Sequence, residues 1–230
     1  MALTRRLVKG QALTAAEHDA NIDHFEQNPN GIYVPKSAQI GIKIDETSPD
    51  WGWHDLTGQM AFEEATGTTP TLTIYQGTIK QRLFDVNDIG SGVFHMPHDY
   101  AEGTDLYLHT HWSHTSATVT TGAVNWQAEV MYAKGHDQAS FSTPIIVNMN
   151  QNASTTRYQH MIAESPMSAA AGAGGLLVTG DMEADGLIII ELSLTSNTMD
   201  GGAMPYFHTL DIHYQSTGVA TKQRAPAFHV

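Results

Sequence analysis

Histidine is the residue type that offers most chemistry in this sequence. The chain has 13 histidines and no cysteine. His95 and His98 stand in one short segment, and His109, His111 and His114 stand in the next. On a strand, His109 and His111 would point to the same side, roughly 7 Å apart for a rise of about 3.3 Å per residue. Two such imidazoles can share one metal ion, so this pair is the first candidate for a metal site.

The segment that leads into this pair is similar to the opening of the metal motif of the cupins. Gly103 is followed, after five residues, by His-Thr-His. The cupin motif has a Glu three or four residues after the second His, whereas this chain has Thr115 and Ser116 there, and the next acid is Glu129. The resemblance implies a cupin-like metalloenzyme as one alternative, with His95, His98 or His114 completing the site.

Two other interpretations of the pair remain. The imidazoles can pack with Tyr107 and Trp112 and satisfy their nitrogens within the sheet. They can also hold a structural metal at a subunit axis, where His109 and His111 of three chains would supply six nitrogens. Our prediction is the first of these: no metal ion, with His109 and His111 kept as the candidates if one is bound.

Other signatures of catalysis are missing from the sequence. It contains no Gly-x-Ser-x-Gly elbow, no P-loop and no Gly-x-Gly-x-x-Gly after a strand. The lack of cysteine excludes disulfides, thiolate catalysis and Cys-ligated metal centres. We therefore predict no catalytic residue and no cofactor.

Two further groups of residues could bind a ligand, but each also has a simpler structural explanation. Asp181, Glu183 and Asp185 could bind calcium, although three acids between glycines more often form a solvated turn. Trp51 and Trp53 could stack on a sugar, and a buried strand start is the simpler expectation.

Period-two alternation predicts the elements that must position these side chains. The clearest strand is 123–134, where Val124, Trp126, Ala128, Val130 and Tyr132 alternate with mostly polar residues. The other main strands are expected at 71–75, 105–112, 186–194 and 204–215. The apolar run of 186–194 indicates a central strand covered on both sides. In 204–215, Tyr206, His208, Leu210, Ile212 and Tyr214 are expected on one face.

These segments, with turn signals between them, predict a mainly β protein. We expect a jelly-roll-like antiparallel β-sandwich of about eight to ten strands, preceded by a short N-terminal helix. The chain divides into an N-terminal helical anchor segment (1–30), connecting strands or linker (31–52) and the β-sandwich body (53–230).

The predicted helix of the anchor segment begins with a capping box. Thr14 is followed three residues later by Glu17, and the Asn-Pro-Asn-Gly of residues 28–31 ends the helix at about residue 27. Ile22 and Phe25 are the only sizeable apolar residues of this helix. So thin an apolar stripe makes a marginal helix in water, and it needs a partner surface to dock against.

Charge is distributed unevenly along the chain. The formal net charge is −13, yet residues 1–10 carry Arg5, Arg6 and Lys9 and no acid. Residues 83–221 contain 14 acids and two basic residues, a balance of −12. Such a body repels phosphate backbones, so we expect no nucleic-acid partner. No run of 18 apolar residues occurs, so we expect no membrane insertion.

The N-terminal segment resembles that of many tailed-phage fibre and virion proteins. The stretch 3–22 carries their Val-Lys-Gly, Leu-Thr, Glu and Asp-Ala-Asn pattern. The body is similar to a group of phage-encoded β-sandwich proteins over 94–100, 103–114, 122–130 and 210–215, although 216–224 matches only loosely. Together these stretches cover about half the chain in the right order.

This resemblance implies a bacteriophage virion structural protein that is not an enzyme, found in the virion and assembled in the host cytoplasm. It implies a homotrimer with a jelly-roll head. The N-terminal segment would contact other virion proteins, with Arg5, Arg6, Lys9, Ile22 and Phe25 as anchoring residues. We expect a tail fibre or spike subunit for host attachment, whose distal surface would meet a host receptor. The alternative is a capsid decoration (cement) protein that stabilises the phage head.

Overall fold

A computed structural model describes residues 51–62 and 68–228 of the chain. The chain divides into two units, Met1–Trp51 and Gly52–Val230, and the strands below all belong to the second unit. The predicted helix over 14–27 and the short strands expected before residue 51 lie outside the described residues. None of the helices in the described ranges has the length and hydropathy of a membrane-spanning segment.

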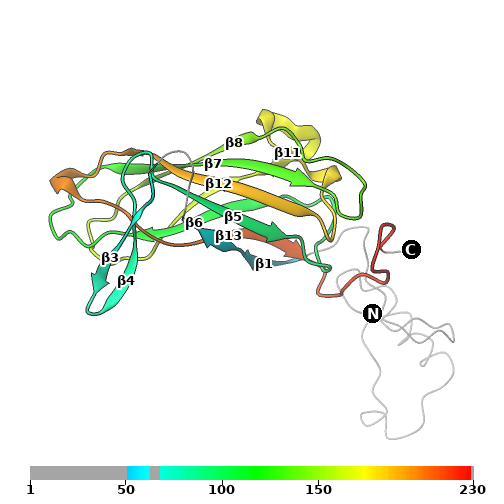
Figure 1. The fold of residues 1–230 in the computed structure, drawn as a ribbon, viewed down its shortest axis with the longest axis horizontal. Helices are drawn as coiled ribbons and strands as arrows, with labels where there is room; N and C mark the ends of the chain where they lie inside the picture. Colours follow the sequence, from blue (N-terminus) through cyan, green and yellow to red (C-terminus); the bar gives the residue numbers. More distant parts are fainter. Residues whose placement is uncertain (1–50, 63–67, 229–230) are drawn as a thin grey trace, which may run out of the picture. The chain divides into compact units, whose positions relative to one another are not determined.

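Two antiparallel sheets form the body (Figure 1). One has the strand order β3-β4-β13-β6-β9, with β1 pairing β13 beside this path. Its strands are β1 (Gly52–Thr57), β3 (Thr71–Gln76), β4 (Ile79–Leu83), β6 (Tyr107–Ser113), β9 (Met161–Pro166) and β13 (Tyr206–Ser216).

The other sheet has the order β2-β5-β12-β7-β8. Its strands are β2 (Gln59–Ala61), β5 (Ile89–His95), β7 (Ala123–Ala133), β8 (Ile145–Asn152) and β12 (Leu187–Asn197). A two-residue parallel pair and three short 3-10 helices lie in the connections: β10 (Ser168–Ala169), β11 (Leu177–Val178), η1 (Ala170–Gly175), η2 (Thr179–Asp181) and η3 (Asp200–Gly202). The protein is mainly β, with a jelly-roll-like antiparallel sandwich, as the sequence predicts.

The core lies between the two sheets. Inward-facing residues of β6 and β13 pack in one cluster with those of β7 and β12, because alternate side chains of each strand point to the same face. An aromatic group fills its middle: Phe84 stands 5.0 Å from Trp126 and 5.6 Å from Phe207, measured between ring centroids. Burial of these large apolar rings stabilises the sandwich.

The strand predictions agree with the structure in position and differ in two details. β12 is the central strand of its sheet, as expected, but its burial alternates, so it is covered fully on one face only. In β13 the pairing register shifts between Phe207 and Thr209. Phe207 and Leu210 therefore both face the core. The prediction that Tyr206 and His208 share a face with Leu210 is wrong.

The described residues contain thirteen strands, more than the eight to ten expected. Three of the strands, β2, β10 and β11, have only two or three residues. Segments so short show no alternation that a sequence pattern could reveal.

We expect Phe84→Ala to lower the free energy of unfolding by about 3–5 kcal/mol, because it leaves a cavity in a fully buried aromatic group. The matched control is Phe141→Ala, which truncates an exposed phenylalanine and should change stability by no more than about 0.5 kcal/mol. Urea denaturation followed by fluorescence measures both values. Equal losses for the two variants would show that the aromatic group does not organise the core.

Candidate functional site

The six-stranded sheet places the predicted histidine pair on the face that points away from the core. Leu108 and Trp112 of β6 are fully buried in the core cluster. Side chains alternate along a strand, so His109 and His111 project from the opposite face. Their ring centroids are 6.1 Å apart, on the same side of the sheet as the spacing predicts.

Strand pairing brings two carboxylates to this pair. Asp211 of β13 and Glu164 of β9 are both the cross-strand partners of His109, one on each side of β6. His109 Nε2 is 2.7 Å from Glu164 Oε2, and His109 Nδ1 is 3.5 Å from Asp211 Oδ2. His111 Nε2 is 2.6 Å from Asp211 Oδ1. Sequence reasoning missed both acids, since alternation indicates a residue's face but not its partner strand.

A third histidine joins the cluster from the loop before β9. His160 Nε2 forms a 2.7 Å hydrogen bond with His111 Nδ1, and the two rings stack at 4.9 Å. We call the set of His109, His111, His160, Glu164 and Asp211 the His109 cluster. Each of its two central imidazoles is held by an outer partner on one nitrogen and faces Asp211 with the other.

The centre of the His109 cluster is shielded from water although it lies on the outer face. Asp211 is 3% exposed and His109 is 7% exposed. Neighbouring rings flank this face: Trp53 contacts Tyr107 and His213, and the His213 ring stands 4.8 Å from that of His109. A buried carboxylate requires a partner, because burial of an unpaired charge is strongly unfavourable.

Next to the cluster, a serine joins two rings of different strands. Ser113 Oγ lies 2.8 Å from both the Tyr75 hydroxyl and His208 Nε2. Burial lowers the pKa of His208 below its ordinary value of 6.5, and the nearby imidazoles of His160 and His111 lower this pKa further. His208 is therefore held in its neutral form more strongly than an exposed histidine.

His95 and His98, expected as possible partners of His109, belong to another cluster. His95 Nε2 is 2.8 Å from Asp185 Oδ1, and His98 Nε2 is 3.9 Å from the same oxygen. His136 contacts the other oxygen of this carboxylate. His95 and His98, which the sequence suggested as further ligands beside His109 and His111, therefore lie next to Asp185 instead.

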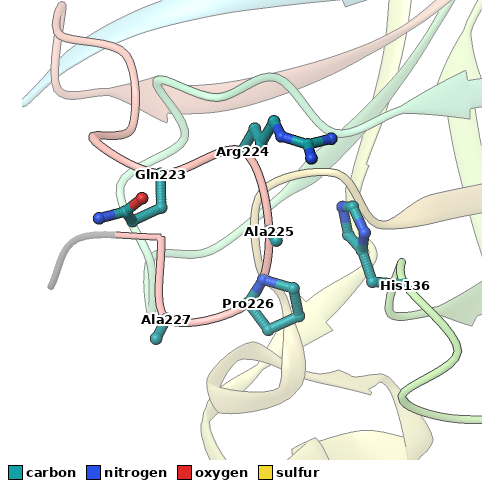
Figure 2. A pocket seen from close by; sticks show the side chains of 6 residues that line it. All are labelled: His136, Gln223, Arg224, Ala225, Pro226 and Ala227. Carbon is teal, nitrogen blue, oxygen red and sulfur yellow. The ribbon is translucent and has the colours of Figure 1, made fainter.

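The C-terminal segment packs against this second cluster. Phe228 is buried, with its ring 5.7 Å from that of His98 and 6.0 Å from that of His136. His98 Nδ1 also forms a 2.6 Å hydrogen bond with Thr221 Oγ1. A hollow beside these contacts is lined by His136 and residues 223–227 (Figure 2). Arg224 is the one Lys, Arg, Asp or Glu residue in this lining. The contacts of His98 and His136 with Phe228 and Thr221 hold the C-terminal segment against this cluster.

The remaining sequence candidates do not form a site. His114 is buried and its Nε2–H donates to the Ser154 carbonyl, 2.8 Å away. Glu183 Oε2 lies 3.7 Å from Lys134 Nζ, and the Asp185 carboxylate contacts histidines. The carboxylates of the two residues do not converge as a calcium site would require.

Two other expectations have different outcomes. Trp53 is the second residue of β1, near the strand start as expected, but it is exposed rather than buried. The expectation of a buried strand start is therefore wrong for its side chain. Its ring packs on Tyr107 and His213 at the surface of the sheet. The anchoring residues Arg5, Arg6, Lys9, Ile22 and Phe25 lie outside the described residues.

Within the described ranges, two groups of side chains bring possible metal ligands to within 4.8 Å of one another. One is Asp55, His109 and His213, and the other is His109, His111 and Asp211. Asp55 is exposed, whereas the second group is centred on buried Asp211. Two imidazoles and a carboxylate suit a first-row transition metal better than Ca²⁺ or Mg²⁺.

We expect the half-buried His208 to make the folded state less stable in acid. The unfolded chain takes up a proton at this side chain near pH 6.5, while the folded chain resists it, so stability falls as pH drops through about 6.5. His208→Gln should flatten the curve of unfolding free energy against pH between 8 and 5, by at most about 1.4 kcal/mol per pH unit. Urea denaturation between pH 8 and 5 measures the unfolding free energy of the wild-type protein and of the variant. Identical slopes against pH for the two proteins would contradict the role given to His208.

No family model matches this chain, and no curated protein matches it. Among solved structures, it is similar to a xylan-binding module, CBM15, with 9% identity, a TM-score of 0.30 and coverage of 74% of this chain and 94% of that one. It is also similar to the CBM22-1 xylan-binding domain of Paenibacillus barcinonensis Xyn10C, with 10% identity, a TM-score of 0.28 and coverage of 72% and 86%. A CBM4 structure shows 9% identity, a TM-score of 0.24 and coverage of 59% and 78%. Likeness at this level says nothing about ligands.

Proposed function

We propose that this chain is a structural protein of a bacteriophage virion, a trimeric tail-fibre or spike subunit that attaches the particle to its host. The observation that carries the proposal is the order of its parts. A basic N-terminal segment resembling phage fibre anchors precedes a jelly-roll-like body. The anchor would dock on other virion proteins through Arg5, Arg6, Lys9, Ile22 and Phe25, and the body would meet a host surface receptor.

An exposed apolar hairpin supports self-association. Strands β3 and β4 form a hairpin that projects from the sandwich (Figure 1), and β3 is an edge strand. Leu72 and Ile74 lie on one face of β3 and are 52% and 58% exposed, and large apolar side chains that adjoin one another on a surface often contact a partner. Tyr75 faces the other way and ties the hairpin to Ser113. We assign Leu72 and Ile74 to the contact between copies of the chain.

A head decoration protein is the alternative assignment within the same class. A fibre subunit should bind host cells through its body, whereas a decoration protein should bind only assembled heads. Incubation of the purified chain with empty heads and, separately, with host cells distinguishes the two roles. Binding to neither would contradict both versions of the proposal.

A cupin-like metalloenzyme is the rival from another class. In the structure the acids beside His109 are Asp211 and Glu164, which come from other strands rather than from the position that the cupin motif gives to its Glu. The sequence offers no further catalytic signature in support of this rival.

We expect the purified protein to have a mass of about 75 kDa by light scattering, three times the chain mass of 25.0 kDa. The double variant Leu72→Glu/Ile74→Glu should reduce the mass to that of one chain, because an apolar contact cannot accept unpaired carboxylates. Ile146→Glu, at an exposed isoleucine of the other sheet, is the control and should leave the mass unchanged. A monomeric wild-type protein, or a double variant that keeps the wild-type mass, would contradict the assigned contact.

Removal of residues 1–30 should leave a folded body that no longer joins the particle. The predicted helix of this segment is marginal alone, so its apolar residues serve docking rather than the core. Circular dichroism and thermal unfolding report the fold, and sedimentation with virions reports incorporation. A matched full-length variant with Arg5, Arg6 and Lys9 changed to Glu should fold normally and bind particles less. Loss of the fold in the truncated chain would make the helix part of the body and refute the division at residue 30.

A further inference from the structure

We propose that His109, His111 and Asp211 bind a divalent first-row transition-metal cation such as Zn²⁺. The ligand atoms would be His109 Nδ1, His111 Nε2 and the Asp211 carboxylate. This inference concerns the folded body alone and does not depend on a role in a virion. It replaces our sequence-based prediction of no metal ion.

Unpaired polar atoms converge at the centre of the His109 cluster. Within the described ranges, five buried side-chain nitrogen or oxygen atoms have no hydrogen-bond partner, and three of them are His111 Nε2, Asp211 Oδ1 and Asp211 Oδ2. Each such atom is unfavourable when buried, and the cost is largest for a charged group. Natural proteins leave few such atoms, so three at one point indicate a ligand that satisfies them.

A simple ion pair between His111 and Asp211 does not explain this geometry. His111 Nε2 and Asp211 Oδ1 are only 2.6 Å apart, yet they do not form a directed hydrogen bond. An imidazolium that paired with the carboxylate would aim its N–H at the oxygen, since hydrogen bonds weaken steeply away from linear geometry. A nitrogen and an oxygen atom that lie this close without a directed hydrogen bond between them fit two ligands of one metal ion instead.

Outer partners fix the imidazoles in the orientation that metal binding requires. His109 Nε2–H donates to Glu164 Oε2 at 2.7 Å, which leaves Nδ1 on the side of Asp211. His111 Nδ1 is hydrogen-bonded to His160 Nε2 at 2.7 Å, which leaves Nε2 on that side. Histidines that bind metal ions nearly always engage their second nitrogen in this way, often with a carboxylate.

The backbone places the three ligands close to the required separation. Asp211 is directly opposite His109 across β6 and β13, and His111 follows two residues along the same face. Their ligand atoms lie within 4.8 Å of one another. Metal–ligand distances of about 2.0–2.2 Å imply separations of about 3–3.5 Å around the ion, which small side-chain rotations can reach.

The donor set selects the class of cation. Two imidazole nitrogens and one carboxylate oxygen suit Zn²⁺, Ni²⁺, Co²⁺ or Fe²⁺, whereas Ca²⁺ and Mg²⁺ prefer oxygen ligands. Three protein ligands leave a further coordination position for water. The site would thus join the two adjacent strands β6 and β13 through one ion.

Titration of the tag-free, chelator-treated protein with Zn²⁺ alone tests the proposal by calorimetry and by metal analysis of the dialysed peak. We expect one ion per chain and a raised melting temperature, with no such effect from Mg²⁺ at equal concentration. A content of one ion per three chains would indicate an axial site instead and would overturn the assignment, as would no binding.

Variants locate the ion. Asp211→Asn and His111→Gln should each weaken Zn²⁺ binding by more than about 100-fold, because each removes a ligand. Glu164→Gln should weaken binding by about 10–100-fold, because it removes the carboxylate that orients His109. Asp185→Asn, in the other histidine cluster, should leave the affinity unchanged. Co²⁺ absorption spectra of the folded variants give a second readout that a merely structural role would not alter. Unchanged affinity and spectra in both His111→Gln and Glu164→Gln would overturn the proposal, even if Asp211→Asn failed to fold.

Discussion

The pairing register of β6 with β13 is the constraint on which the candidate site depends. In this register Leu108 and Ile212 are cross-strand partners that face the core, and His109 and Asp211 are partners that face outward. A slip of one residue would exchange the two faces of β13, because side chains alternate with a period of two. The hydrophobic core and the His109 cluster are therefore specified by the same set of backbone hydrogen bonds.

The two histidine clusters show two ways of placing a carboxylate among imidazoles. Asp185 lies in a partly exposed turn, where His95 and His136 contact it from different segments and Phe228 packs beside them. Water and several partners satisfy such a group at little cost. Asp211 is enclosed by its sheet and lacks directed donors, so its charge needs a stronger partner than solvent provides.

The absence of cysteine gives the His109 cluster a wider significance. A chain without cysteine has no disulfide with which to cross-link its strands. Coordination of one cation by residues of β6 and β13 would supply a cross-link of another kind in the middle of the six-stranded sheet. The same sheet carries the β3–β4 hairpin, which Tyr75 fastens through Ser113 of β6. Self-association and cation binding would thus both act on one sheet of the body.

The sequence by itself determined the mainly β class, the positions of the long strands and the common face of His109 and His111, because all three follow from period-two alternation. It did not reveal the register shift after Phe207, since a bulge changes no residue type, nor the shortest strands, which have too few residues to alternate. Only the tertiary structure decided that Asp211 and Glu164, far away in sequence, stand beside His109, and that His95 and His98 turn to Asp185. Pairing between distant strands depends on how the whole sandwich closes around its core, and no local pattern contains that information.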